Sequence, residues 1–182
     1  MKLTAIILAG GKSSRMGEDK GLMMFEGRPM IQYIIDTVKP FVDDVMIIVN
    51  QDGYNAFGYT VYADLIKNSG PLAGIYTGLH YTKTAKNVIL SCDVPFVTKE
   101  VIKELIDNCE EVDGVICENE GRTHQLIGVY DKSNAEFFKN ELENGQRKIK
   151  LALQKLNFKT INLNHFDSKI FNNINSKDDI KT

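Results

Sequence analysis

The stretch LTAIILAGGKSSRMGEDK, from Leu3 to Lys20, joins a short apolar run to a loop rich in glycine and positive charge. The run Leu3 to Leu8 has the apolar and β-branched character of a buried strand. Behind it, Gly10 and Gly11 leave backbone N–H groups open to phosphate oxygens, and lysine and arginine follow at once. On composition alone, a phosphate-binding loop and an ordinary solvated surface turn are equally compatible with these residues.

Neither of the two common phosphate-loop patterns fits this stretch. When GxxxxGK[ST] is aligned on Gly11 and Lys12, its first glycine falls on Ile6, inside the apolar run. The pattern GxGxxG requires glycine where Lys12 stands. The function of the loop therefore has to be inferred from the fold around it.

Strand and helix patterns alternate along the rest of the chain. Apolar runs bounded by Gly, Asn, Asp or Pro predict strands at Val45 to Val49, Tyr59 to Tyr62, Val88 to Leu90, Val112 to Cys117, Leu126 to Tyr130 and Phe158 to Leu163. Amphipathic patterns predict helices at Met30 to Val38, from Pro71, at Val101 to Cys109, around Phe137 to Leu142 and at Arg147 to Leu156. Ser133 and Glu136 have capping-box spacing before the fourth helix.

This order predicts an α/β fold: one Rossmann-like, three-layer domain over residues 1–182, with a mostly parallel central sheet and helices on both faces. In such a sheet, ligands bind beyond the carboxyl ends of the strands. We therefore expect the loop after Leu8 to lie at the ligand-binding edge.

The composition narrows the class of protein. The chain has 182 residues, 43% of them hydrophobic, and a formal net charge of -2, which gives no basic surface for nucleic acid. No segment approaches the roughly 20 apolar residues of a membrane span. Three cysteines without CxxC spacing, Cys92, Cys109 and Cys117, favour buried thiols in a reduced compartment. We expect a cytoplasmic protein with neither a nucleic-acid nor a membrane partner.

Four sequence blocks in a fixed order resemble a known family. They are LAGGxSxRMGxDK with GRP behind it, Gly70-Pro71-Leu72-Ala73-Gly74-Ile75, Cys92-Asp93-Val94-Pro95-Phe96, and Asn173-Ile174-Asn175-Ser176 before Asp178 and Asp179. Together they resemble the molybdenum cofactor guanylyltransferases, nucleotidyltransferases of the MobA type, from residue 3 to about residue 180. The resemblance implies a nucleotide-diphospho-sugar transferase-like fold.

The resemblance also implies a reaction, in which GMP passes from GTP to the terminal phosphate of molybdopterin or Mo-molybdopterin and pyrophosphate leaves. Such a transfer needs positioning, charge neutralisation and Mg²⁺ more than a protein nucleophile. By resemblance, Arg15, Lys20 and Asp93 are catalytic. The implied nucleotide-binding set is Leu8, Ala9, Gly10, Gly11, Lys20, Asp64, Gly70, Pro71, Leu72 and Asp93.

Two positions are candidate magnesium ligands. Asp93 follows a predicted strand and precedes Pro95, so its carboxylate should project from a carboxyl end. Asn173 and Asn175 flank Ile174, and alternation places both on the face opposite it. By resemblance, Asn175 is the second oxygen donor. The alternatives are an aspartate that only turns the chain and asparagines that cap a last helix.

Asp64, directly after a predicted strand, is the candidate reader of guanine. A carboxylate accepts two hydrogen bonds, and guanine offers two donors, its N1–H and its exocyclic amine. A solvated loop aspartate is the alternative. Gly74, on the helix that begins with Pro71, would allow a close backbone approach.

The second substrate requires a further set of binding residues. His124, Arg147, Lys148 and Asn173 are the candidates, although Gln125 stands where the family has proline. Cations at a helix start oppose the helix dipole, so a bound phosphate would explain Arg147 and Lys148. The resemblance further implies hand-over of the product to molybdoenzyme-specific chaperones and other cofactor-biosynthesis proteins.

Two other functions are compatible with these motifs. A cytidylyltransferase acting on molybdopterin or another small phosphorylated substrate would use nearly the same loop, although the second glycine of LAGG, Gly11, favours guanine in the family. A non-catalytic nucleotide-binding module would not need Lys20, Asp93 and Asn175 together. The four nucleoside triphosphates, tested for binding and for pyrophosphate release, distinguish these functions.

Overall fold

The computed structural model describes residues 1–9, 19–174 and 179, and over these residues seven strands form one sheet. The strands are β1 (Leu3–Leu8), β4 (Asp44–Ile48), β5 (Thr60–Tyr62), β6 (Lys86–Ser91), β7 (Gly114–Asn119), β8 (Arg122–Asp131) and β9 (Phe158–Asn162). Their order in the sheet is β5-β4-β1-β6-β8-β7-β9. All the strands predicted from the sequence are present, with ends shifted by a few residues.

The sheet is mostly parallel, as predicted. Strand β1 pairs in parallel with β4 and β6, β4 with β5, and β7 with β9. The exception is β8, which runs antiparallel to both β6 and β7. Because β5, β4, β1 and β6 are parallel neighbours, their carboxyl ends meet at one edge.

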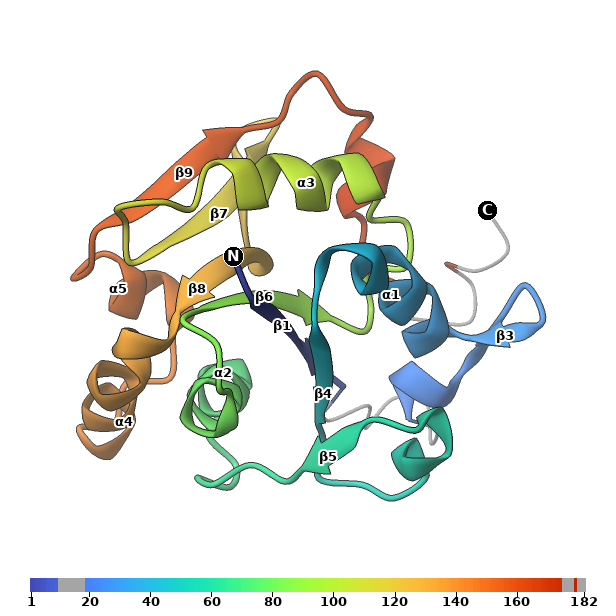
Figure 1. Ribbon diagram of the computed structural model, residues 1–182, viewed down its shortest axis with the longest axis horizontal. Coiled ribbons are helices and arrows are strands. Elements are labelled where there is room, and N and C mark those ends of the chain that lie inside the picture. The colour runs from blue at the N-terminus through green and yellow to red at the C-terminus, as the bar shows by residue number, and fades with distance from the viewer. Residues whose placement is uncertain (10–18, 175–178, 180–182) are drawn as a thin grey trace.

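Helices cover both faces of the sheet (Figure 1). They are α1 (Met30–Val38), α2 (Pro71–Tyr81), α3 (Lys99–Asp107), α4 (Ala135–Glu143) and α5 (Ile149–Leu153). Alternation in β1 separates two cores: Ala5 and Ile7 pack with α1 and α3, whereas Ile6 and Leu8 pack with α2, α4 and α5. None of the described helices is long and apolar enough to cross a membrane.

Short elements fill the connections. A small hairpin, β2 (Met24–Phe25) and β3 (Arg28–Pro29), precedes α1. The 3₁₀ turns are Lys20–Leu22, Lys39–Phe41, Tyr54–Phe57, Lys132–Asn134 and Ser168–Phe171.

Two sequence predictions about helix ends are wrong. Ser133 does not cap α4, because it lies in the turn Lys132–Asn134, where its N–H donates to Asp131. The last predicted helix was placed over Arg147 to Leu156, but α5 is shorter and begins after Lys148. In both cases a side chain two residues earlier accepts the backbone N–H before the helix begins: Asp131 accepts from Ser133, and Gln146 accepts from Lys148.

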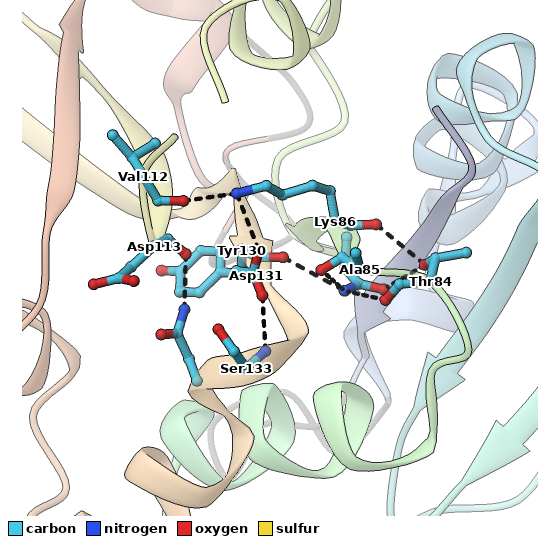
Figure 2. A network of polar contacts seen from close by, with 10 residues as sticks. Thr84, Ala85, Lys86, Val112, Asp113, Tyr130, Asp131 and Ser133 are labelled. Atoms are coloured by element: carbon cyan, nitrogen blue, oxygen red, sulfur yellow. Dashed lines mark hydrogen bonds and ion pairs between the residues drawn. The ribbon is translucent and has the colours of Figure 1, made fainter. Parts of the chain in front are cut away.

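A polar network closes the sheet edge at which β6 begins and β8 ends (Figure 2). The Lys86 ammonium donates to the Val112 carbonyl at 2.6 Å and lies 3.1 Å from the Asp131 carboxylate. Burial alone raises the pKa of Asp131, but hydrogen bonds from Ser133 and Lys86 outweigh it and leave that pKa below its usual value. The Lys86 ammonium and the Asp131 carboxylate thus form an ion pair that is hydrogen-bonded to its surroundings at the amino end of β6, away from the carboxyl ends of the parallel strands.

Candidate active site

Polar residues that follow the parallel strands gather at the carboxyl edge of the sheet. Ala9 comes directly after β1 and donates its N–H to the Ile48 carbonyl of β4 at 2.9 Å. Asp64 follows β5, and Asp93 follows β6, the other neighbour of β1. The parallel order therefore brings these parts of the predicted site to the same edge.

The centre of the site is the Asp93 carboxylate. Its Oδ1 accepts a hydrogen bond from the Ser91 hydroxyl at 2.6 Å, and its Oδ2 accepts one from the Asn173 amide at 3.2 Å. The Lys20 ammonium lies 3.7 Å from Oδ2, with side chains that are 23% (Lys20) and 16% (Asp93) exposed. Three distant segments of sequence thus meet at one half-buried carboxylate.

Lys20 is delivered by a tight turn. Asp19 caps the 3₁₀ turn Lys20–Leu22 by accepting from the Gly21 N–H at 3.0 Å. The Met23 N–H closes the turn on the Asp19 carbonyl at 3.1 Å. The short, capped turn fixes the backbone from which the Lys20 side chain reaches Asp93.

Asn173 is delivered by the segment after the turn Ser168–Phe171. The Ile174 N–H donates to the Asp93 carbonyl at 2.8 Å, and the Ile174 side chain, 1% exposed, packs with Met23 and Phe25. Asn173 is exposed on the opposite side and reaches Asp93, as the predicted alternation requires.

Asp64, predicted to bind guanine, is hydrogen-bonded to Asn50 and partly buried. Asp64 is half-buried, its Oδ2 accepts from the Asn50 amide at 2.8 Å, and its N–H donates to Asn50 Oδ1 at 2.9 Å. Burial raises the pKa of Asp64, and the bond from Asn50 lowers it by less. This environment disfavours the alternative of a freely solvated loop aspartate.

The GPLAG motif starts α2 beside Asp64. Gly70 has φ +69°, a conformation that favours glycine, and Pro71 is the first helical residue, followed by the fully buried Leu72. A Cβ on Gly74 would lie 3.1 Å from Leu8 Cδ2 and 3.6 Å from Asp64 Oδ1. Gly74 therefore lets α2 approach both the end of β1 and the carboxylate, as predicted.

A cleft of about 840 Å³ opens on the Asn173 side of Asp93. Its walls combine aromatic, aliphatic, cationic, acidic and amide side chains: Phe25, Glu26, Phe96, Arg122, Asp167, Lys169, Ile170, Asn172, Asn173, Ile174 and Asp179. Phe25 and Phe96 meet edge to face, with ring centres 5.5 Å apart. Asn173 contacts Asp93 and also lines the cleft, so the Asp93 carboxylate and the cleft are parts of one site.

Of the predicted second-substrate residues, only Asn173 lines this cleft. His124 lies on β8 with its ring 5.1 Å from that of Phe171, and burial, with a smaller effect of Arg122, lowers its pKa. Arg147 Nη1 donates to the Leu142 carbonyl at 2.7 Å, at the C-terminal end of α4.

The contact of Arg147 explains its charge without a ligand, because a cation is favourable at a helix C-terminus. The N–H of Lys148 donates to Gln146 Oε1 at 2.9 Å, and the side chain is exposed. The argument from an unfavourable helix dipole therefore does not hold for Arg147.

Four predicted site residues, Gly10, Gly11, Arg15 and Asn175, lie outside the described residues. Among the described ones, sequence reasoning missed Ser91, Phe96 and Arg122. Ser91 could have been found, because it lies two residues before Asp93 and alternation turns both to one side. Other cleft residues, such as Arg122, Asp167 and Lys169, lie outside the four sequence blocks, so no such signal indicated them.

The donors at Asp93 fit a magnesium ion that takes part of its ligands from a substrate. In residues 1–9, 19–174 and 179, no three His, Cys, Asp or Glu side chains group into a protein-only metal site. Magnesium in proteins commonly uses one or two carboxylates together with phosphates and waters. A single half-buried carboxylate beside an asparagine suits that pattern.

Known proteins resemble this chain over most of its length. Residues 5–157 match the model of the MobA-like NTP transferase domain. A protein of Flavobacterium johnsoniae described as a probable molybdenum cofactor guanylyltransferase is 37% identical over 179 residues, which cover 98% of this chain and 94% of that protein. The molybdenum cofactor guanylyltransferase of Yersinia pseudotuberculosis is 34% identical over 181 residues, covering 97% and 92%.

A solved structure shares the fold. The crystal structure of molybdopterin-guanine dinucleotide biosynthesis protein A from Archaeoglobus fulgidus superimposes with a TM-score of 0.80 at 27% identity and covers 98% of this chain and 95% of that one. This likeness confirms the predicted fold class. The chain therefore belongs to the family of MobA-like NTP transferases, together with the molybdenum cofactor guanylyltransferases.

Proposed function

We propose that the protein transfers GMP from GTP to the terminal phosphate of molybdopterin or Mo-molybdopterin and releases pyrophosphate. The family supports the type of reaction. The observation that carries the proposal is the meeting of Lys20, Asp93 and Asn173 at the carboxyl edge of the sheet, beside a cleft of substrate size.

The chemistry requires little of the protein beyond charge and position. An acceptor phosphate oxygen forms a bond to the α-phosphorus, and the bond to the bridging oxygen breaks, so that its electron pair leaves with pyrophosphate. The acceptor is already anionic, and no general base is needed. Lys20 is suited to neutralise the leaving group.

In the free protein, Lys20 balances the charge of Asp93 at 3.7 Å. We propose that a bound triphosphate draws the ammonium towards its own oxygens, which leaves the Asp93 carboxylate available to hold Mg²⁺. The ion supplies charge neutralisation to the triphosphate. Ser91 and Asn173 keep the carboxylate oriented while Lys20 changes partner.

We assign the two substrates to the two sides of Asp93. Asp64, half-buried at the end of β5, faces the nucleotide side and would accept the N1–H and amino groups of guanine. The acceptor would bind in the cleft, where Phe25 and Phe96 suit a flat ring system and Arg122 suits a phosphate.

We further propose that the reaction takes place in the cytoplasm and that molybdoenzyme-specific chaperones receive the product. All three cysteines, Cys92, Cys109 and Cys117, are unpaired and buried, which suits a reducing compartment.

The test is a panel of the four nucleoside triphosphates, each with molybdopterin and Mg²⁺, assayed for pyrophosphate release. The proposal expects release with GTP. Preferential release with CTP would instead identify a cytidylyltransferase. Tight nucleotide binding without release from any of the four would identify a non-catalytic module.

A further inference from the structure

A buried tyrosine contacts the turn that carries Lys20. Tyr54 begins the 3₁₀ turn Tyr54–Phe57, between β4 and β5, and is 1% exposed. Its hydroxyl donates a hydrogen bond to Asp19 Oδ1, the same oxygen that accepts from the Gly21 N–H at 3.0 Å. Tyr54 and Asp19 are 35 residues apart, so this bond ties the Lys20 turn to a different part of the fold.

The two turns also fit together sterically. A Cβ on Gly21 would overlap the Tyr54 hydroxyl, and a Cβ on Gly53 would lie 2.9 Å from Leu22 Cδ1. Gly53 has φ 104°, which favours glycine independently of the available space. The contact thus depends on Gly21 within one turn and on Gly53 directly before the other, and it leaves little room for the Lys20 turn to shift.

One oxygen of the Asp19 carboxylate is buried at a cost. In the part of the chain that the structure describes, Asp19 Oδ2 is buried and accepts no hydrogen bond. A buried acceptor without a donor is unfavourable, because it has lost its hydrogen bonds to water. The other oxygen therefore carries the polar contacts of this carboxylate, with Tyr54 as one of its two donors.

These groups belong to the same locality as Asp93. Asp19 directly precedes Lys20 and caps its turn, and the Lys20 ammonium lies 3.7 Å from Asp93 Oδ2. Burial and the bond to Asp19 raise the pKa of Tyr54, so its hydroxyl keeps its proton and remains a donor.

From this geometry we infer that Tyr54 is a positioning residue for the transfer reaction. Through Asp19 it fixes the turn that presents Lys20 to Asp93 and to the triphosphate. Among the described residues its hydroxyl donates to Asp19, whereas the Asp93 carboxylate accepts from Ser91 and Asn173, so Tyr54 acts through Asp19. The role in turnover rests on the proposed function, whereas the placement of Lys20 does not.

The first experiment is Tyr54→Phe, which keeps the ring and removes the hydroxyl. We expect kcat for pyrophosphate release to fall about tenfold, equivalent to about 1.4 kcal/mol, with KM for GTP little changed. In the Lys20→Ala background the same substitution should change kcat by less than about twofold, because the residue through which it acts is gone.

The matched control is Tyr130→Phe. Tyr130 is 0% exposed, and its hydroxyl donates to the Gln125 carbonyl at 2.6 Å, away from the Lys20 turn. This variant should lower the melting temperature without lowering kcat. Wild-type kcat in Tyr54→Phe, or an equal loss with and without Lys20, would show that Tyr54 is only a core residue.

A second readout needs no substrate. Lysine amines carrying ¹³C-methyl groups give NMR resonances, and the Lys20 resonance is assigned by its absence in Lys20→Arg. We expect it to move in Tyr54→Phe and to stay in place in Tyr130→Phe. If the wild type transfers no nucleotide, the proposed function is wrong and this shift alone decides the placement; an unmoved Lys20 resonance overturns the inference.

Discussion

Replacing Asp93 by asparagine should raise the Mg²⁺ requirement of the enzyme and leave the fold intact. The amide can keep the hydrogen bonds of the carboxylate: its oxygen can accept from Asn173, and its NH₂ can donate to the Ser91 hydroxyl, which both donates and accepts. What Asp93→Asn removes is therefore mainly the negative charge.

The size of the effect follows from the distance to Lys20. Unit charges about 4 Å apart attract by about 4 kcal/mol at an effective dielectric constant of 20, and the pair here is 3.7 Å apart. Partial exposure and desolvation offset most of this, so we expect about 1 kcal/mol of lost stability, or about 2–4 °C in melting temperature. The same charge would attract Mg²⁺. If Asp93→Asn removes only about a third of an attraction of that size, about 1.4 kcal/mol, the Mg²⁺ concentration that gives half-maximal activity rises about tenfold.

The assay titrates Mg²⁺ against pyrophosphate release at saturating GTP, alongside melting curves without nucleotide. Asp131→Asn is the matched control, since Asp131 pairs with Lys86 at 3.1 Å on the other edge of the sheet. It should lose stability and keep the wild-type Mg²⁺ requirement. An unchanged requirement in Asp93→Asn would refute the metal assignment, and a melting temperature many degrees lower would point to a structural role.

Lys20→Ala should lower kcat by about 10²- to 10³-fold, because a charge-assisted contact in the transition state is lost, while circular dichroism stays unchanged; wild-type turnover would exclude Lys20 from the mechanism. Asp64→Ala should weaken GTP binding more than binding of inorganic triphosphate in calorimetry, and equal losses would mean that Asp64 does not read guanine. Because the pKa of Asp131 is lower in the folded protein than the usual 3.8, its ionised carboxylate stabilises the fold above pH 3.8. This contribution is lost as the pH falls from 3.8 through the lower pKa of the folded state. Denaturant unfolding between pH 6 and about 3 should therefore show a smaller acid loss in Asp131→Asn than in the wild type, and identical slopes would contradict the assignment.

The strands were predictable because their signal is local. Each is an apolar run bounded by turn residues, and in β1, β4 and β6 nearly every residue is buried, which is typical of central parallel strands. The helix ends were less predictable, because they depend on tertiary partners. Ser133 has the right spacing for a capping box, yet Asp131 takes its N–H first, and the cation at Arg147 serves the end of α4 rather than the start of α5.

The site divides in the same way. Asp93 was predictable as a polar residue after a buried strand, and the order of parallel strands places it beside Ala9. Asn173 lies 80 residues further along the chain, so the local sequence around Asp93 does not indicate that the two side chains are hydrogen-bonded. The contact of Tyr54 with Asp19 is likewise invisible before folding, because it depends on two turns that meet only in the finished structure.

The hydrogen bond from Ile174 to the Asp93 carbonyl has a consequence for synthesis on the ribosome. The chain emerges from its amino end, so Lys20, Ser91 and Asp93 leave the exit tunnel long before Asn173. A nascent chain can thus assemble the nucleotide side of the site while the cleft still lacks one wall. Only when the segment through Ile174 has been released can this wall of the cleft form, so the proposed acceptor side is completed after the proposed nucleotide side.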